Sequence, residues 1–130
     1  MGRPGATDMS EPTPPGSAPP KSAALRNFER MLAAGKDSAL LRYSIGNEHA
    51  KAGDWPAAVD ALAQAVVLDP TYTAAWKLYA RALEQAGRPA QALDAYRHGI
   101  IVAKQKGDRQ AEKEMTVFAR RIERALGSEQ

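Results

Sequence analysis

The chain has 130 residues and a formal net charge of +3, which is sufficient for one domain with its own core. It contains no cysteine, and this excludes disulfides, thiolate metal sites and thiol nucleophiles. No apolar run approaches the roughly 18 residues of a membrane span, and the N-terminus lacks the apolar stretch of a secretory signal, so we expect a soluble, cytoplasmic protein without a membrane partner.

The first segment of the chain, residues 1–20, contains six prolines and three glycines and almost nothing to bury. Such a composition cannot recover the entropy lost on ordering, so it predicts a disordered tail. Its prolines also favour an extended polyproline II conformation, which could serve as a ligand for a proline-recognition module. We favour the simpler interpretation of an inert leader.

From Lys21 onwards, apolar residues recur at intervals of three and four, which is typical of amphipathic helices. Glycines and prolines interrupt this pattern at regular places. We expect six helices and no strand, and hence an all-α fold. The first helix is expected at about 22–34, the next four form pairs within 39–72 and 73–106, and the last spans about 108–126. Residues 21–130 are expected to form a single domain.

The chain matches itself when it is shifted by 34 residues. Ala52-Gly53 falls on Ala86-Gly87, and the run Ala-Val-Asp-Ala at 58–61 falls on Ala-Leu-Asp-Ala at 92–95. A fixed period of this length, with two helices in each period, is typical of a helical repeat array.

The first expected helix of the second period carries Trp76-x2-Tyr79-Ala80-x2-Leu83, and the equivalent helix of the first period carries a weaker version from Arg42 to His49. The chain therefore resembles the tetratricopeptide repeat (TPR) family, in the form of a small bacterial TPR domain protein. The resemblance implies an α-α superhelix with two full repeats, flanked by a half-repeat helix and a capping helix. Lys104 replaces the proline that would close the second repeat, so we expect that helix to run on to about Lys106 and the array to end after it.

Small residues recur where the resemblance places helix crossings. Two helices approach closely only where side chains are short. The residues expected at these crossings are Gly46, Ala58, Ala65, Ala80, Ala92 and Gly99.

In TPR domains the first helix of each repeat lines a concave groove. By register, the predicted groove residues of this chain are Tyr43, Asn47, Lys51, Lys77, Arg81 and Gln85. Two cations beside an amide and a phenol favour an acidic peptide or a C-terminal carboxylate, although these could also be ordinary solvated residues. The TPR clamp for acidic chaperone tails is not predicted, because Asn47 alone matches its set of five residues.

The sequence offers little for catalysis. His49 replaces a packed aromatic residue of the repeat, and His98 has no acidic or nucleophilic partner nearby in the sequence. There is no metal-ligand spacing and no nucleotide-binding glycine loop. We therefore expect a protein-binding scaffold without cofactor, and not an enzyme. Trp55, in the turn between two helices, could pack under its loop or act as a binding hot spot.

Two alternatives concern the ends of the array. Residues 104–124 hold seven basic and four acidic residues, which raises nucleic-acid binding. Because Glu112, Glu114 and Glu123 lie within helical reach of these cations, we expect a salt-bridged cap and no nucleic acid. The exposed end of the array could also stack on a second copy, so we expect a monomer or a weak homodimer.

Overall fold

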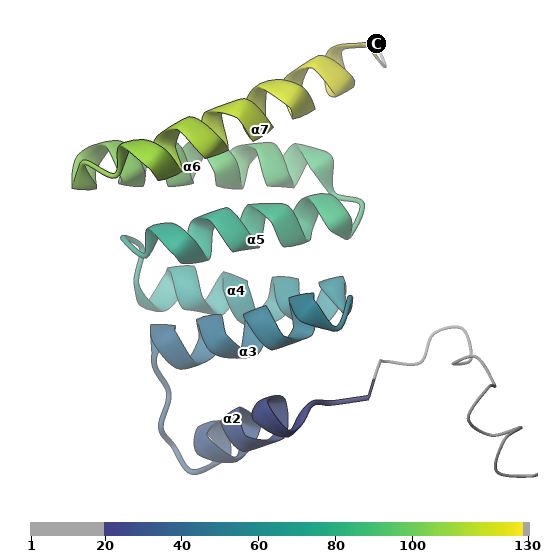
Figure 1. The fold of residues 1–130 in the computed structure, drawn as a ribbon, viewed down its shortest axis with the longest axis vertical. Coiled ribbons are helices and arrows are strands. Elements are labelled where there is room, and N and C mark those ends of the chain that lie inside the picture. Colours follow the sequence, from purple (N-terminus) through teal and green to yellow (C-terminus); the bar gives the residue numbers. More distant parts are fainter. Residues whose placement is uncertain (1–19, 129–130) are drawn as a thin grey trace, which may run out of the picture.

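The computed structural model describes residues 20–128, and within them the chain forms six helices and no strand. The helices are α2 (Ala23–Ala33), α3 (Ala39–Lys51), α4 (Trp55–Leu68), α5 (Thr73–Gln85), α6 (Pro89–Lys106) and α7 (Arg109–Ser128). They stack in chain order, with α2 at one end and α7 at the other (Figure 1). The all-α repeat architecture is confirmed. The tail predicted to be disordered lies, up to residue 19, outside the described residues, so its disorder stays a prediction.

The helix boundaries follow from local chemistry. Ser38 caps α3, because its Oγ accepts a hydrogen bond from the Leu41 N–H at 3.0 Å. Asp37, the residue before it, accepts a hydrogen bond from the Arg42 guanidinium. At the start of α4, Asp54 accepts the Ala57 N–H and Pro56 occupies the first turn. As the missing proline predicted, α6 continues to Lys106.

The turns inside the two repeats are equivalent. Gly53 follows α3 and Gly87 follows α5, with φ angles of 77° and 80°. A residue with a side chain rarely adopts this left-handed conformation, so glycine ends both helices and reverses the chain. The pairs α3–α4 and α5–α6 are thereby held as the two 34-residue units that the sequence indicated.

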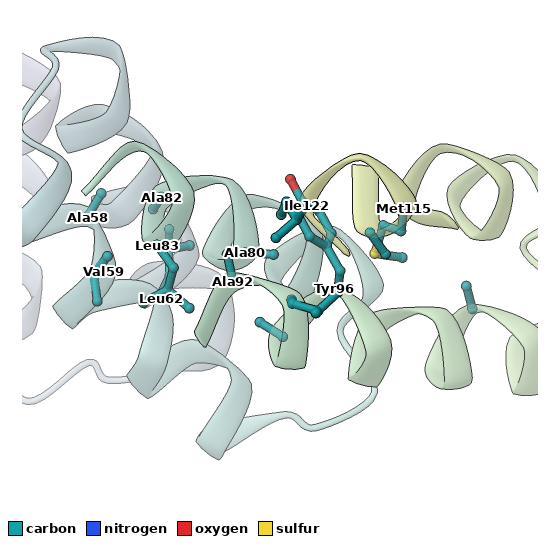
Figure 2. Close-up of a cluster of buried hydrophobic side chains, with 14 residues drawn as sticks. Ala58, Val59, Leu62, Ala80, Ala82, Leu83, Ala92, Tyr96, Met115 and Ile122 are labelled. Atoms are coloured by element: carbon teal, nitrogen blue, oxygen red, sulfur yellow. The ribbon is translucent and has the colours of Figure 1, made fainter. Parts of the chain in front are cut away.

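The main buried cluster joins α4, α5, α6 and α7, and Figure 2 shows its side chains. Leu62, Tyr96 and Met115 are its largest fully buried members. Two glycines make room for Leu62 and Met115. A Cβ at Gly46 would lie 2.5 Å from Leu62 Cγ, and a Cβ at Gly99 would lie 2.5 Å from Met115 Sδ.

The other crossing residues are alanines with no exposed surface: Ala58, Ala65, Ala80 and Ala92. Together with the two glycines they confirm the expected close helix approaches. The last helix, α7, buries Met115, Ala119 and Ile122 and packs on α6 and, over part of its length, on α5. This arrangement brings the side chains of α7 beside the predicted groove residues of α5.

Candidate peptide-binding groove

Two neighbouring hollows lie along α5, and Arg81 lines both. The first, which we call the Phe118 hollow, has a volume of about 400 Å³ and is lined by Lys77, Arg81, Glu84, Gln85, Tyr96, Phe118 and Arg121. The second, the Trp55 hollow, has a volume of about 310 Å³ and is lined by Asn47, Ala50, Lys51, Trp55, Leu78 and Arg81. The first helices of both repeats and α7 therefore contribute to one continuous candidate surface.

Five of the six predicted groove residues line these hollows. Asn47, Lys51 and Arg81 belong to the Trp55 hollow, and Lys77 and Gln85 join Arg81 in the Phe118 hollow.

Tyr43 lines neither hollow. The centroid of its ring lies 5.0 Å from the centroid of the Tyr72 ring, and its side chain packs against the buried clusters. Burial, and secondarily the neighbouring Tyr43, raises the pKa of the Tyr72 hydroxyl above its usual value. Tyr43 therefore serves the packing between the two repeats.

Two of the predicted cations are already engaged. The Lys77 ammonium donates to the Glu114 carboxylate of α7, and this hydrogen bond is the main reason that the pKa of Glu114 lies below its usual value. Lys51 forms an ion pair with Glu48 at 2.8 Å, which likewise lowers the pKa of Glu48. From the sequence we expect Lys77 to be available to an anionic ligand. In the structure its ammonium is already paired with the Glu114 carboxylate of α7.

Arg81 is different. Within residues 20–128 no carboxylate lies in ion-pair distance of its guanidinium. The guanidinium carbon instead lies 5.7 Å from the ring centroid of Trp55, which is a cation–π geometry. Trp55 is half-buried at the start of α4. It packs against the main buried cluster and also contacts the cation that faces both hollows, while its role as a binding hot spot stays a prediction.

The Phe118 hollow also contains residues that the sequence did not assign to the groove. The ring centroids of Phe118 and Tyr96 lie 5.6 Å apart, and the guanidinium carbon of Arg121 lies 5.2 Å from the centroid of the Phe118 ring. Arg121 also forms an ion pair with Glu84 at 3.0 Å. Burial raises the pKa of Tyr96, which is 1% exposed, to about 12. Phe118 is half-buried on the amphipathic helix α7, and an amphipathic pattern alone does not indicate that such a residue borders a hollow.

The acidic residues of α7 do not neutralise the cations of their own helix. Glu114 pairs with Lys77 of α5, and Glu123 pairs with Arg97 of α6 at 2.7 Å. Both glutamates lie beside the buried stripe of α7, where they face the neighbouring helices. The salt bridges expected for this cap are therefore present, but they join α7 to α5 and α6 and do not pair residues of α7 with one another.

Neither histidine lies in a hollow of this groove. His49 is half-buried in α3, and His98 is exposed on α6, where its ring stacks on Trp76 at 5.1 Å with an interplanar angle of 12°. Residues 20–128 contain no group of three or more side chains arranged to hold a metal ion. In that same range, none of the helices combines the length and apolarity needed to cross a membrane.

Comparison with known proteins agrees with the repeat geometry. The sequence profile of the tetratricopeptide repeat family matches residues 49–110. The TPR repeat-containing protein PA0015 of Pseudomonas aeruginosa is 46% identical over 101 residues, which cover 78% of this chain and 96% of that protein. The chain belongs to the tetratricopeptide repeat family. Members of this family generally mediate protein–protein interaction.

Solved structures of other proteins share the arrangement. Protein BPP2914 from Bordetella parapertussis is 38% identical, with a TM-score of 0.70, over 80% of this chain and 90% of that one. The tetratricopeptide repeat domain protein of Salinibacter ruber is 25% identical in its crystal structure, with a TM-score of 0.62, over 67% of this chain and 97% of that one. In this TPR domain the candidate groove lies on α3 and α5, the first helices of the two repeats, and α7 completes it.

Proposed function

We propose that the chain is a non-enzymatic adaptor that binds a short segment of a partner protein in the concave groove, through one carboxylate held by Arg81. The observation that carries the proposal is the position of Arg81, which lines both hollows and has no carboxylate partner within residues 20–128. A guanidinium can hold a carboxylate through two parallel hydrogen bonds, which gives both energy and orientation.

The charges around Arg81 indicate how many anionic groups the ligand carries. Lys77 is matched by Glu114, and Arg121 is matched by Glu84, so Arg81 is the excess cation of the Phe118 hollow. A run of several acidic residues would place carboxylates beside Glu84 and Glu114, where repulsion costs binding energy. The expectation of an acidic peptide thus narrows to a single carboxylate, from a C-terminus or from one acidic side chain.

Apolar surface flanks the cation on both sides. Trp55 and Leu78 line the Trp55 hollow, and Phe118 lines the other. We therefore expect apolar side chains next to the ligand's carboxylate, since burying them supplies most of the binding energy. With two full repeats the groove is short, so the affinity should be modest, on the order of micromolar. The lack of cysteine fits the reducing cytoplasm, where we place the adaptor.

The test uses synthetic peptides on an array, each made with a free and with an amidated C-terminus and with apolar or polar flanking residues. For the peptides that bind, we expect Arg81→Gln to weaken binding at least about tenfold, and Arg81→Lys to recover part of it. Arg88→Gln is the matched control, because Arg88 is an exposed cation in the α5–α6 turn that lines neither hollow. Peptides that bind Arg81→Glu as tightly as the unchanged protein would contradict the proposal.

A further inference from the structure

The outward side of α7 is a stripe of cations around one exposed valine. Arg109, Lys113, Val117, Arg120 and Arg124 follow one another at steps of four, four, three and four, so they share one helix face, and all are exposed. The stripe extends over about 22 Å of helix. Within residues 20–128 none of its four cations forms an ion pair: Glu114 and Glu123 bond to other helices, and Glu112, half-buried beside Lys113, forms no ion pair. We call this surface the cationic stripe.

A second unpartnered surface lies on α4 and α6. It is a hollow of about 360 Å³, which we call the outer hollow, lined by Ala63, Val66, Val67, Trp76, Tyr79, Leu83, Gln91, Asp94, Ala95 and His98. Val67 is 75% exposed beside it, and Ile101, one 34-residue period later, is 55% exposed. α5 contributes Trp76, Tyr79 and Leu83 here, which are different residues from those that face the peptide groove.

Within the described residues, the same two helices each carry one exposed carboxylate without a partner. Asp60 on α4 and Asp94 on α6 stand one period apart. Of the exposed carboxylates within residues 20–128, these are the two that make neither an ion pair nor a hydrogen bond: Asp37 and Glu123 pair with arginines, and Asp108 caps α7. The face thus combines exposed aliphatic side chains with unpaired carboxylates.

We propose that these two surfaces bind each other in different copies of the chain. The cationic stripe of one copy lies across the α4–α6 face of the next, with Val117 entering the outer hollow beside Val67 and Ile101, and with Lys113 or Arg120 pairing with Asp94. Val117 is 62% exposed, so the contact would bury apolar surface on both sides. A helix that places an apolar residue in the groove between two others is a common recognition mode.

The contact joins two different surfaces, so each copy keeps one of them free. Such a heterologous arrangement does not close on itself, and further copies can add at both ends. The assembly should therefore grow with concentration. Because the charges are exposed, salt should weaken it.

Other binding partners fit the cationic stripe and the α4–α6 face less well. Stacking the two ends of the array would bring Arg26 and Arg30, exposed on α2, against the cationic stripe. Pairing the α4–α6 face with its own copy would bring like carboxylates together. A nucleic acid would gain nothing from Val117, because phosphate contacts need cations alone.

The first experiment is sedimentation equilibrium of the full chain over a wide range of concentration. The average mass should rise above the 14.0 kDa monomer at about 50 mM salt and fall back at about 500 mM. The charge reversals K113E/R120E/R124E and D60K/D94K should each remain monomeric, and an equimolar mixture of the two should associate again. R26E/R30E, on α2, is the matched control and should associate like the unchanged protein, as should R81E in the peptide groove. A monomer up to about 1 mM, or a mixture that stays monomeric, would overturn the proposal.

The second experiment locates the contact. Because the chain has no cysteine, single cysteines can be introduced without removing any. Under mild oxidation V117C should form a mixed disulfide with V67C much faster than with L40C, a control at Leu40, which is 64% exposed on α3. Equal rates would refute the geometry. Retardation of a DNA duplex that K113E/R120E/R124E abolishes, with the unchanged protein monomeric, would assign the stripe to nucleic acid instead.

Discussion

Replacing Gly46 with alanine tests how closely α3 must approach α4. The new Cβ would lie 2.5 Å from Leu62 Cγ and 2.8 Å from Leu62 Cδ2, whereas unstrained carbon atoms stay about 3.5–4.0 Å apart. Leu62 is 0% exposed, so it cannot rotate out into solvent. Relief therefore requires the two helices to move apart by several tenths of an ångström or more.

The magnitude follows from two opposing terms. Overpacking a filled core costs about 1–3 kcal/mol. Alanine in place of glycine inside a helix returns up to about 1 kcal/mol. We expect a net loss of about 1–2 kcal/mol in the free energy of unfolding, which for a domain of this size lowers the thermal midpoint by roughly 4–10 °C. Circular dichroism of the helix signal during heating measures this directly.

Gly127→Ala is the matched control, because Gly127 is also helical and a Cβ there would meet no atom within 4 Å. It should leave the midpoint unchanged or raise it slightly. In a Leu62→Ala background the clashing atoms are absent, so Gly46→Ala should lose most of its penalty. Equal effects of Gly46→Ala and Gly127→Ala, or additivity with Leu62→Ala, would refute the reasoning. The outcome also concerns the groove, because Asn47 is the next residue and its position depends on this helix approach.

Three further predictions concern the groove. Glu114→Gln should release Lys77 and tighten the binding of carboxylate peptides in calorimetry; weaker binding would mean that the ion pair itself holds the groove together. Trp55→Ala should weaken the same peptides and Trp55→Phe much less, because phenylalanine keeps a ring under Arg81; equal losses would argue against a cation–π role. Tyr96, with a pKa of about 12 in the folded chain against 10.0 for the free group, keeps its proton while the unfolded chain loses it, so stability should fall as pH rises from about 10 to 12, by up to about 2–3 kcal/mol. Urea unfolding of Tyr96→Phe should lack this part of the alkaline loss, and parallel curves for the two proteins would contradict it.

The helices could be predicted because the residues that decide them repeat. Gly53 and Gly87 must be glycine for the same backbone reason, and the small residues at the crossings follow the same interval. Register alone also placed Asn47, Lys51, Arg81 and Gln85 beside the hollows. Where one residue determines its local geometry, or where two repeats share it, the sequence is informative.

Tyr43 shows where register stops being sufficient. It is equivalent in register to Lys77, but it lies beside Tyr72, a residue of the turn between the repeats, and its ring packs there. The partner of Lys77 could not be predicted either, because Glu114 lies 37 residues away on a helix that departs from the 34-residue register. Side-chain pairing across helices depends on how each helix is rotated about its own axis. The sequence of α7 alone does not show which of its polar residues face α5 and α6.

The ion pairs that Glu114 and Glu123 of α7 form with α5 and α6 determine what both proposed surfaces can bind. Glu114 neutralises Lys77 in the groove, and Glu123 neutralises Arg97 on the outer side of α6. Each glutamate therefore pairs with a cation of a neighbouring helix and with none of the cationic stripe. Arg81 is left as the excess charge inside the groove, and the cations of α7 are left outside. Because the groove and the α4–α6 face use different residues of α5, a copy bound to its neighbour still presents Arg81. A carboxylate peptide and self-association should therefore not compete, and saturating peptide should leave the sedimenting mass of the assembly, corrected for the bound peptide, unchanged; a fall to monomer would show that the two surfaces are coupled.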